Sequence, residues 1–77
     1  MFDYNMLSQR TLDFLEYTKE KSPELTFITL INPVEEIVTV YAQRATNVIQ
    51  RRTQVYTFRD FLKADFEKIR QTLLLKF

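Results

Sequence analysis

Few residues of this chain have side chains suited to catalysis. The sequence contains neither histidine nor cysteine, which removes the usual general base, the commonest metal ligand and any thiolate nucleophile. The hydroxyls of Ser8 and Ser22 occupy positions expected of helix caps, and no histidine is present to activate them. Glycine is also absent, so a glycine-rich phosphate-binding loop cannot form. We therefore expect a protein that is not an enzyme and that binds no cofactor.

Two close pairs of carboxylates remain as candidates for metal binding, Glu16 with Glu20 and Glu35 with Glu36. A two-metal site in a helical bundle also requires Glu-x-x-His motifs, which this chain cannot supply. The first pair is predicted on a solvated helix face, and the second at a helix N-terminus, where the helix dipole favours negative charge. Both pairs have a structural explanation, and we predict no metal site.

Five polar residues in the second half of the chain form a candidate nucleic-acid site. On a helix, Arg44, Asn47 and Arg51 would project in nearly the same direction, with Arg52 and Arg59 close by in sequence. Arginine is suited to phosphate groups, and asparagine can pair with the edge of a base. The net charge is only +1, whereas nucleic-acid-binding domains are usually clearly basic. A nucleic-acid-binding regulator is therefore our alternative prediction.

Five other residues are candidates for contact with a protein partner. Phe14 and Tyr17 would lie on the broad apolar face of the first helix, where they either anchor a partner or fill the core. Asp65 borders the apolar face of the last helix, as a specificity contact or as half of a surface ion pair. Leu74 and Leu75 fall beside that face and offer an apolar contact to a second protomer. The primary prediction is a small protein-binding module, a regulator or inhibitor that occupies a surface of a larger protein.

The composition favours self-association. The 77 residues make one domain, and a core of this size supplies roughly 3–5 kcal/mol of stability without disulfides or a metal. The chain is nevertheless 45% hydrophobic and 14% aromatic. Residues 1–42 carry three basic and seven acidic side chains, whereas residues 43–77 carry eight basic and three acidic ones. We expect a homodimer, with the oppositely charged halves adjacent within the fold or across the dimer.

The sequence shows no sign of a membrane segment. The N-terminus lacks a basic segment followed by an apolar run, and no apolar stretch approaches the roughly 20 residues that span a bilayer. We expect a cytoplasmic protein.

The clearest periodic pattern lies in residues 32–52, which predict a central amphipathic helix. Its apolar side chains recur at helical spacing: Val34, Ile37, Val38, Tyr41, Ala42, Ala45, Val48 and Ile49. Asn32 is suited to the N-cap and Pro33 to the first helical position. Glu35, three residues after the cap, completes a capping box.

Three further helices are predicted around this one. The first begins after Ser8, which we prefer to Asp3 as N-cap, and ends before Ser22-Pro23. A short helix covers residues 25–31, and a last helix follows Thr57 and continues nearly to the C-terminus. The predicted fold is an all-α bundle of three long helices and one short one. Its predicted core is Phe14, Leu15, Leu25, Ile28, Ile31, Ile37, Val38, Tyr41, Val48, Phe58, Leu62, Phe66, Ile69 and Leu73.

The alternative fold is α+β, in the order α-β-β-β-α. Its strands would be residues 26–31, 37–42 and 48–57, which are rich in β-branched side chains, with a turn at Asn32 and Pro33. Against this fold stand the absence of glycine for tight hairpins and the helical spacing of residues 34–49.

Overall fold

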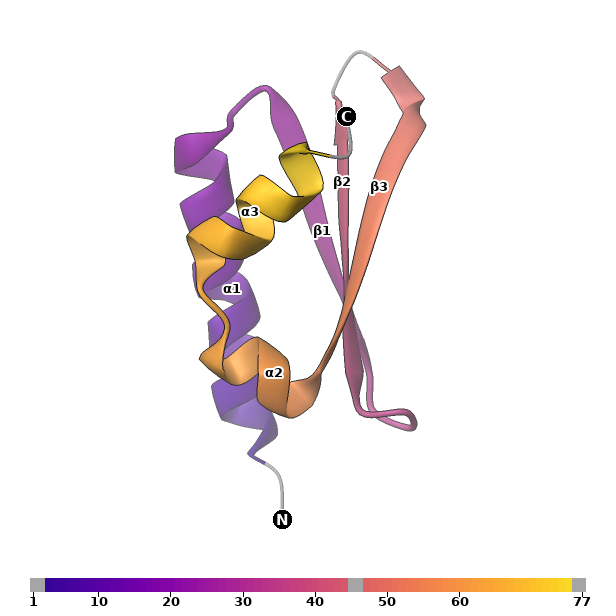
Figure 1. The fold of residues 1–77 in the computed structure, drawn as a ribbon. Helices are drawn as coiled ribbons and strands as arrows, with labels where there is room; N and C mark the ends of the chain where they lie inside the picture. The colour runs from indigo at the N-terminus through magenta and orange to yellow at the C-terminus, as the bar shows by residue number, and fades with distance from the viewer. Residues whose placement is uncertain (1–2, 45–46, 76–77) are drawn as a thin grey trace.

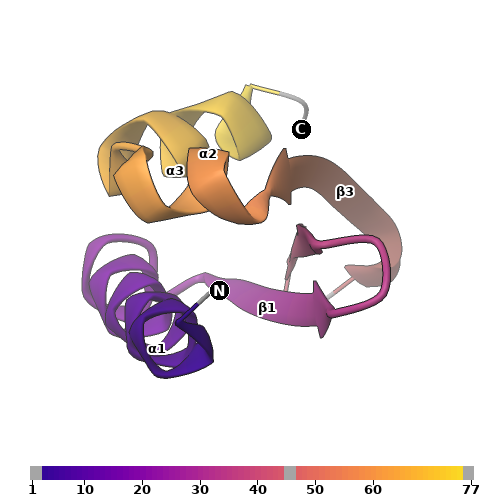
Figure 2. The ribbon, with the colours of Figure 1, turned by 90° about the horizontal axis from the view of Figure 1, so that it is seen from below.

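The fold consists of one antiparallel sheet with three helices on a single side. The computed structural model describes residues 3–44 and 47–75, with only the backbone described over residues 47–50. The elements are α1 (Tyr4–Lys21), β1 (Leu25–Asn32), β2 (Ile37–Arg44), β3 (Asn47–Thr57), α2 (Phe58–Lys63) and α3 (Phe66–Leu74). The strands lie in the order β1-β2-β3, and all three helices cover the same face of the sheet (Figures 1 and 2).

This architecture shows that the all-α prediction is wrong and that the α-β-β-β-α alternative is correct. Residues 25–31 form a strand instead of a short helix, and the predicted central helix is a β-hairpin made of β2 and β3. The helical spacing in residues 34–49 was coincidental. The buried side chains of β2, which are Val38, Val40 and Ala42, recur at every second residue, as they do in a strand with one buried face.

The β1–β2 connection uses the side chain that we expected to cap a helix. The Oδ1 atom of Asn32 accepts hydrogen bonds from the backbone N–H groups of Val34 (3.0 Å) and Glu35 (3.1 Å). This asparagine turn closes a hairpin instead of starting a helix. Glu36 takes the left-handed conformation, with φ of 55°, that glycine commonly adopts in turns. The absence of glycine therefore did not prevent the hairpin.

Helix α1 begins earlier than predicted and ends where predicted. Its N-cap is Asp3 and not Ser8, because the Asp3 carboxylate accepts hydrogen bonds from the N–H groups of Asn5 and Met6. The helix ends at Lys21, and the N–H of the C-cap residue Ser22 donates to the carbonyl of Thr18 at 2.8 Å. The predicted stop at Ser22-Pro23 is thus confirmed.

The predicted last helix is divided into two. Thr57 is the N-cap, as expected, and its hydroxyl accepts a hydrogen bond from the N–H of Asp60 at 3.1 Å. The helix then stops at Lys63, because Ala64 and Asp65 have extended backbone conformations. Asp65 caps the following helix, α3, by accepting a hydrogen bond from the N–H of Glu67 at 2.9 Å. An aspartate that bonds to the backbone in this way favours a cap over a helix interior.

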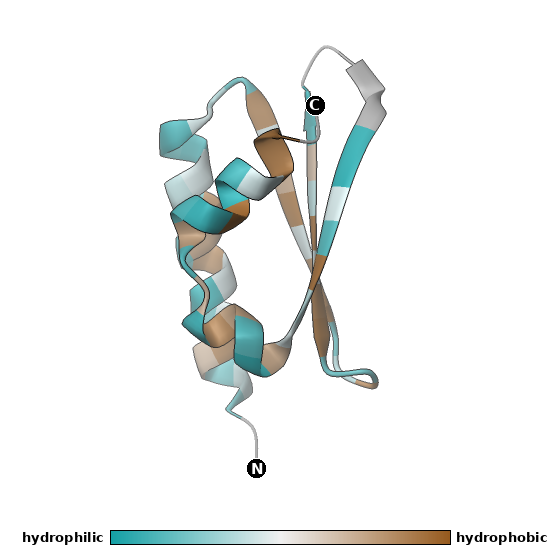
Figure 3. Ribbon diagram, viewed as in Figure 1, coloured by the Kyte–Doolittle hydropathy of each residue, from teal (hydrophilic) through white to brown (hydrophobic). Residues whose placement is uncertain are grey.

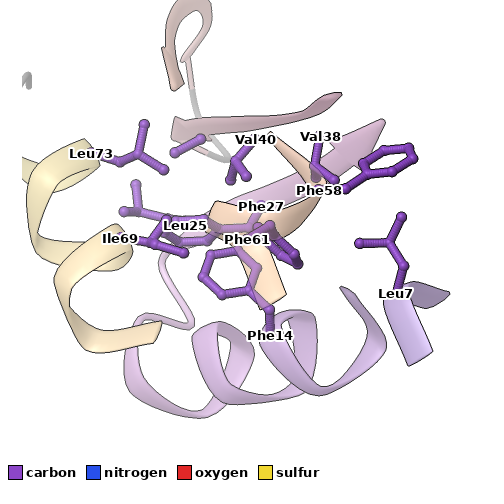
Figure 4. Close-up of a cluster of buried hydrophobic side chains, with 11 residues drawn as sticks. Leu7, Phe14, Leu25, Phe27, Val38, Val40, Phe58, Phe61, Ile69 and Leu73 are labelled. Carbon is purple, nitrogen blue, oxygen red and sulfur yellow. The ribbon is translucent and has the colours of Figure 1, made fainter. Parts of the chain in front are cut away.

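The core lies between the inner face of the sheet and the helices (Figure 4). Phe14 of α1 is fully buried, and its ring lies edge-on to three other rings: Phe27 at 6.0 Å, Phe61 at 5.9 Å and Phe66 at 5.3 Å between centroids. Such edge-to-face arrangements are favoured by the aromatic quadrupole. The buried hydrophobic residues are Leu7, Phe14, Leu25, Phe27, Val38, Val40, Ala42, Phe58, Phe61, Ile69 and Leu73.

The core prediction was correct for most of the helical residues, although it missed Leu7 and Phe61. It was partly wrong for the strands, where the predicted core residues Ile37 and Tyr41 lie on the face away from the helices. The fully buried residues that we predicted are Phe14, Leu25, Val38, Phe58, Ile69 and Leu73, and the partly buried ones are Leu15, Leu62 and Phe66. Ile28 and Ile31 are each 37% exposed, whereas Phe27 and Val40, which we did not select, are buried. A strand alternates its faces at every residue, so helical spacing assigned several of these side chains to the wrong side. Val48 lies outside the described side chains.

Candidate binding surface

The second face of the sheet has no helix of the described chain packed on it (Figure 2). Its side chains alternate along the strands with the buried ones and so point away from the helices. We call this surface the open sheet face. It consists of Thr26, Ile28, Leu30, Asn32, Ile37, Thr39, Tyr41, Gln43, Arg51, Thr53, Val55 and Thr57.

Apolar side chains are grouped near the middle of the open sheet face. Leu30 of β1 and Val55 of β3 both pair with Thr39 of β2, and they are 53% and 52% exposed. Ile28, which pairs with Tyr41, is 37% exposed. Figure 3 shows hydrophobic segments on all three strands. Single exposed apolar residues are common, but a group that spans three adjacent strands is typical of an interaction surface.

The two ends of the sheet carry opposite charge. Arg44, Arg51 and Arg52 lie in strands near the β2–β3 connection, and the acidic residue at the same end is Glu24, which directly precedes β1. The guanidinium of Arg51 lies on the open sheet face, 5.2 Å from the centre of the Tyr41 ring. Glu35 and Glu36 occupy the β1–β2 turn at the opposite end, and both are exposed.

The predicted arginine stripe does not form, because the central helix on which it depended does not exist. Arg51 pairs with Gln43 and lies on the open sheet face, whereas Arg44, the next residue of β2, belongs to the other face. Arg52 also belongs to that face. Arg59 lies on α2, which follows β3 at the opposite end of the sheet. Asn47 pairs with Arg44 through its backbone, and its side chain is outside the described part.

The five predicted partner contacts are placed in different environments. Phe14 is in the core and has no exposed surface. Tyr17 is half-buried between α1 and α3, and the Asp65 carboxylate serves as the N-cap of α3. Leu74 packs partly against the core, whereas Leu75 is 87% exposed. Leu74 and Leu75 line a shallow hollow of about 330 Å³ at the end of α3. The structure does not bring these five residues together on one surface.

A polar network joins α1 to α3. Tyr17 donates its O–H to the Glu67 carboxylate, and Arg70 binds the same carboxylate in a salt bridge, with its Nε 2.9 Å from Oε1. Arg70 also donates to the Ser22 hydroxyl at 2.8 Å, and Gln71 donates to Glu67 at 3.0 Å. Each of these side chains has a partner within the fold, so the network connects the two helices.

These hydrogen bonds explain the titration of the network. The Arg70 guanidinium and the Tyr17 hydroxyl stabilise the ionised Glu67 and lower the pKa of that carboxyl to about 2. The pKa of Tyr17 is raised, because ionisation of the phenol would remove its hydrogen bond to Glu67. Sequence reasoning missed the network. The i, i+3 spacing of Glu67 and Arg70 was a visible signal, but the partners on α1 are about 50 residues away.

Neither a metal-binding cluster nor a membrane-spanning helix is found among the described residues. Within residues 3–44 and 47–75, no three acidic side chains are grouped in a way that would hold a metal ion. No helix in this part of the chain combines the length and the apolar character needed to cross a bilayer. Comparisons with protein families, with curated proteins and with solved structures find no match to this chain.

Proposed function

We propose that this protein is a small, non-enzymatic protein-binding module of the cytoplasm whose binding surface is the open sheet face. The observation that carries the proposal is the apolar group of Ile28, Leu30 and Val55 on a sheet face with no helix packed on it. Antiparallel sheets with one solvated face usually carry polar residues there. This face also exposes roughly half of two large aliphatic side chains, Leu30 and Val55, on either side of Thr39.

The energetic gain from covering this group is considerable for so small a domain. Burying an aliphatic side chain completely contributes about 1.5–3 kcal/mol, and about half of Leu30 and Val55 remains exposed. Covering them therefore contributes roughly 1 kcal/mol each. Ile28 adds a smaller amount, since 37% of it is exposed. A partner that packs on the open sheet face obtains this contribution before any polar contact is made.

A capture experiment with matched variants tests the proposal. The chain is immobilised as wild type, as Leu30→Asp and as Leu12→Asp, and retained proteins are compared after nuclease treatment at high salt. Leu12 is an apt control because it is 56% exposed, but on α1. We expect a protein retained by the wild type and by Leu12→Asp and lost from Leu30→Asp. Equal retention by all three would contradict the assignment of the open sheet face.

The arginine end of the sheet supports nucleic-acid binding as a second candidate function. Arg44 and Arg52 belong to the same face of the sheet near the β2–β3 connection, and Arg51 lies on the opposite face at that end. Phosphate binding through them would weaken steeply as salt concentration rises. Oligonucleotide titrations at several salt concentrations, with Arg44→Glu/Arg52→Glu compared with Arg59→Glu, test this candidate. Binding that is lost only in the double variant favours it, and absence of binding at low salt rejects it.

A further inference from the structure

The charged ends of the sheet flank the apolar group symmetrically. Glu35 and Glu36 lie just before Ile37, the first residue of β2. Arg51 pairs with Gln43, which is the residue before the end of β2. Gln43 is six positions after Ile37 along the strand, which corresponds to about 20 Å. The neighbours of the acidic turn on α2 are Arg59 and Asp60, and their charges offset each other. The end with the β1–β2 turn is therefore acidic overall, the middle of the open sheet face is apolar, and the opposite end is basic overall, since Arg44, Arg51 and Arg52 outnumber Glu24 there.

Such a surface is complementary to a copy of itself. When two sheets pack face to face about a two-fold axis perpendicular to the strands, the strands of the two copies run in opposite directions. The basic end of each copy then lies over the acidic end of the other, and every contact occurs twice. With the axis parallel to the strands, like charges would meet at both ends, which is unfavourable. The apolar groups face one another in the antiparallel arrangement.

On these grounds we propose that the partner bound by the open sheet face is a second copy of this chain. The two copies pack face to face with antiparallel strands, so that Arg51 of each lies near the turn with Glu35 and Glu36 of the other. This inference rests on the proposed function, because it requires the open sheet face to be a protein-binding surface. It adds the identity of the partner and the orientation in which it binds.

The size of the face indicates a weak dimer. Three strands at a spacing of about 4.8 Å, each about eight residues long, present a footprint of roughly 14 by 26 Å. This footprint is small compared with the roughly 800 Å² that each partner buries in a standard stable interface. A micromolar dissociation constant is therefore expected, and in such a dimer the charges at the two ends determine orientation and specificity.

Sedimentation of the purified chain across the micromolar range tests the contribution of the apolar group. The wild type and Leu12→Asp are expected to pass from monomer to dimer as concentration rises, and Leu30→Asp to remain monomeric. Circular dichroism of each variant confirms that the fold is retained. A wild-type chain that stays monomeric throughout would overturn the inference.

A charge exchange tests the antiparallel arrangement. In Glu35→Lys/Glu36→Lys both ends of the face are basic, and in Arg51→Glu the charge of the arginine that lies on the face is reversed. We expect each variant alone to dissociate at least tenfold more readily than the wild type, and an equimolar mixture to form a heterodimer. Formation of the heterodimer in the mixture, with recovery of the wild-type affinity, shows that both variants are folded. Self-association of either variant at wild-type strength, or a mixture that does not recover, would overturn the arrangement.

The same proteins separate failure of this inference from failure of the proposed function. If the wild type is monomeric but captures another protein that Leu30→Asp does not capture, the open sheet face is a binding surface and the second copy is not its partner. If the wild type is monomeric and Leu30→Asp captures whatever the wild type captures, both proposals are rejected.

Discussion

The guanidinium of Arg10 on α1 lies 4.1 Å from the centre of the Phe66 ring at the start of α3. The same group donates hydrogen bonds to the carbonyl oxygens of Phe61 (3.5 Å) and Ala64 (2.5 Å). Phe61 belongs to α2, and its carbonyl also accepts a hydrogen bond from the N–H of Ala64, the C-cap residue of that helix. One half-buried arginine therefore connects the first helix to the junction between the other two.

Replacement of Arg10 is expected to destabilise the fold. Arg10→Met keeps much of the aliphatic packing and removes both hydrogen bonds and the cation over the ring, at a cost of about 1–3 kcal/mol in the free energy of unfolding. The free energy of unfolding of Arg10→Lys should lie between those of Arg10→Met and the wild type, since an ammonium group lacks the planar fork of a guanidinium. Urea denaturation measures these differences, with Lys19→Met on the exposed surface of α1 as control. Equal midpoints for Arg10→Met and the control would show that Arg10 does not hold the junction.

The Glu67 network predicts acid sensitivity. The pKa of Glu67 is about 2 in the folded chain and near 4.5 when unperturbed, so its stabilisation is fully present above pH 4.5 and is lost as the pH falls through 2. Urea midpoints of the wild type and Glu67→Gln, measured from pH 7 down to pH 2, should therefore converge as the pH falls. Glu20→Gln, on the exposed surface of α1, serves as control. A difference between wild type and Glu67→Gln that is independent of pH would contradict the lowered pKa.

The left-handed residue of the β1–β2 turn offers a stabilising substitution. Glu36 has φ of 55°, a conformation that costs a residue with a Cβ atom about 1–2 kcal/mol. Glu36→Gly removes this cost but adds entropy to the unfolded chain, so we expect a net gain of up to about 1 kcal/mol. Thermal unfolding should show a higher midpoint for Glu36→Gly than for the wild type, and no such increase for Glu35→Gly. A lower midpoint for Glu36→Gly would show that the glutamate stabilises the turn by other means.

The aromatic cluster around Phe14 should determine whether the chain folds. Phe14→Ala leaves a cavity among three other rings, at a cost of about 3–5 kcal/mol. This cost equals the whole stability expected of a domain of this size, so the variant should be largely unfolded by circular dichroism. Phe14→Leu retains most of the apolar volume and should fold with a lower melting temperature. A well-folded Phe14→Ala would place the main stabilising contacts elsewhere.

Local chemistry near several residues was determined by the sequence itself. Thr57 caps α2 as predicted, Ser22-Pro23 ends α1, and the side chain of Asn32 bonds to the two N–H groups that a capping residue would satisfy. These interactions join residues within three or four positions of one another. They form whenever the local backbone allows it, so a reader of the sequence can identify them without knowing the fold.

The choice between helix and strand in residues 25–57 was decided by tertiary structure. The sequence in this region permits both, because apolar residues at positions such as 34, 37, 38 and 41 fit a helical face, while β-branched residues favour strands. A strand is stabilised by neighbours that are distant in the chain, here Leu25–Asn32 against Ile37–Arg44 and the latter against Asn47–Thr57. Pairing of this kind leaves no short-range signal beyond composition.

The same dependence on distant contacts decided the functional surfaces. Helical spacing placed Arg44 and Arg51 side by side, whereas the sheet places them on opposite faces. Arg51 pairs with Gln43 and shares its face, and Arg44, the next residue of β2, points to the other side. The open sheet face exists because all three helices pack on one side, and the Tyr17–Glu67 contact exists because α3 lies against α1. The sequence by itself determined the Thr57 cap, the end of α1 and the absence of histidine and cysteine, since these depend on residue type and short spacing. Only the tertiary structure decided which side chains share a face, because that depends on which segments pair.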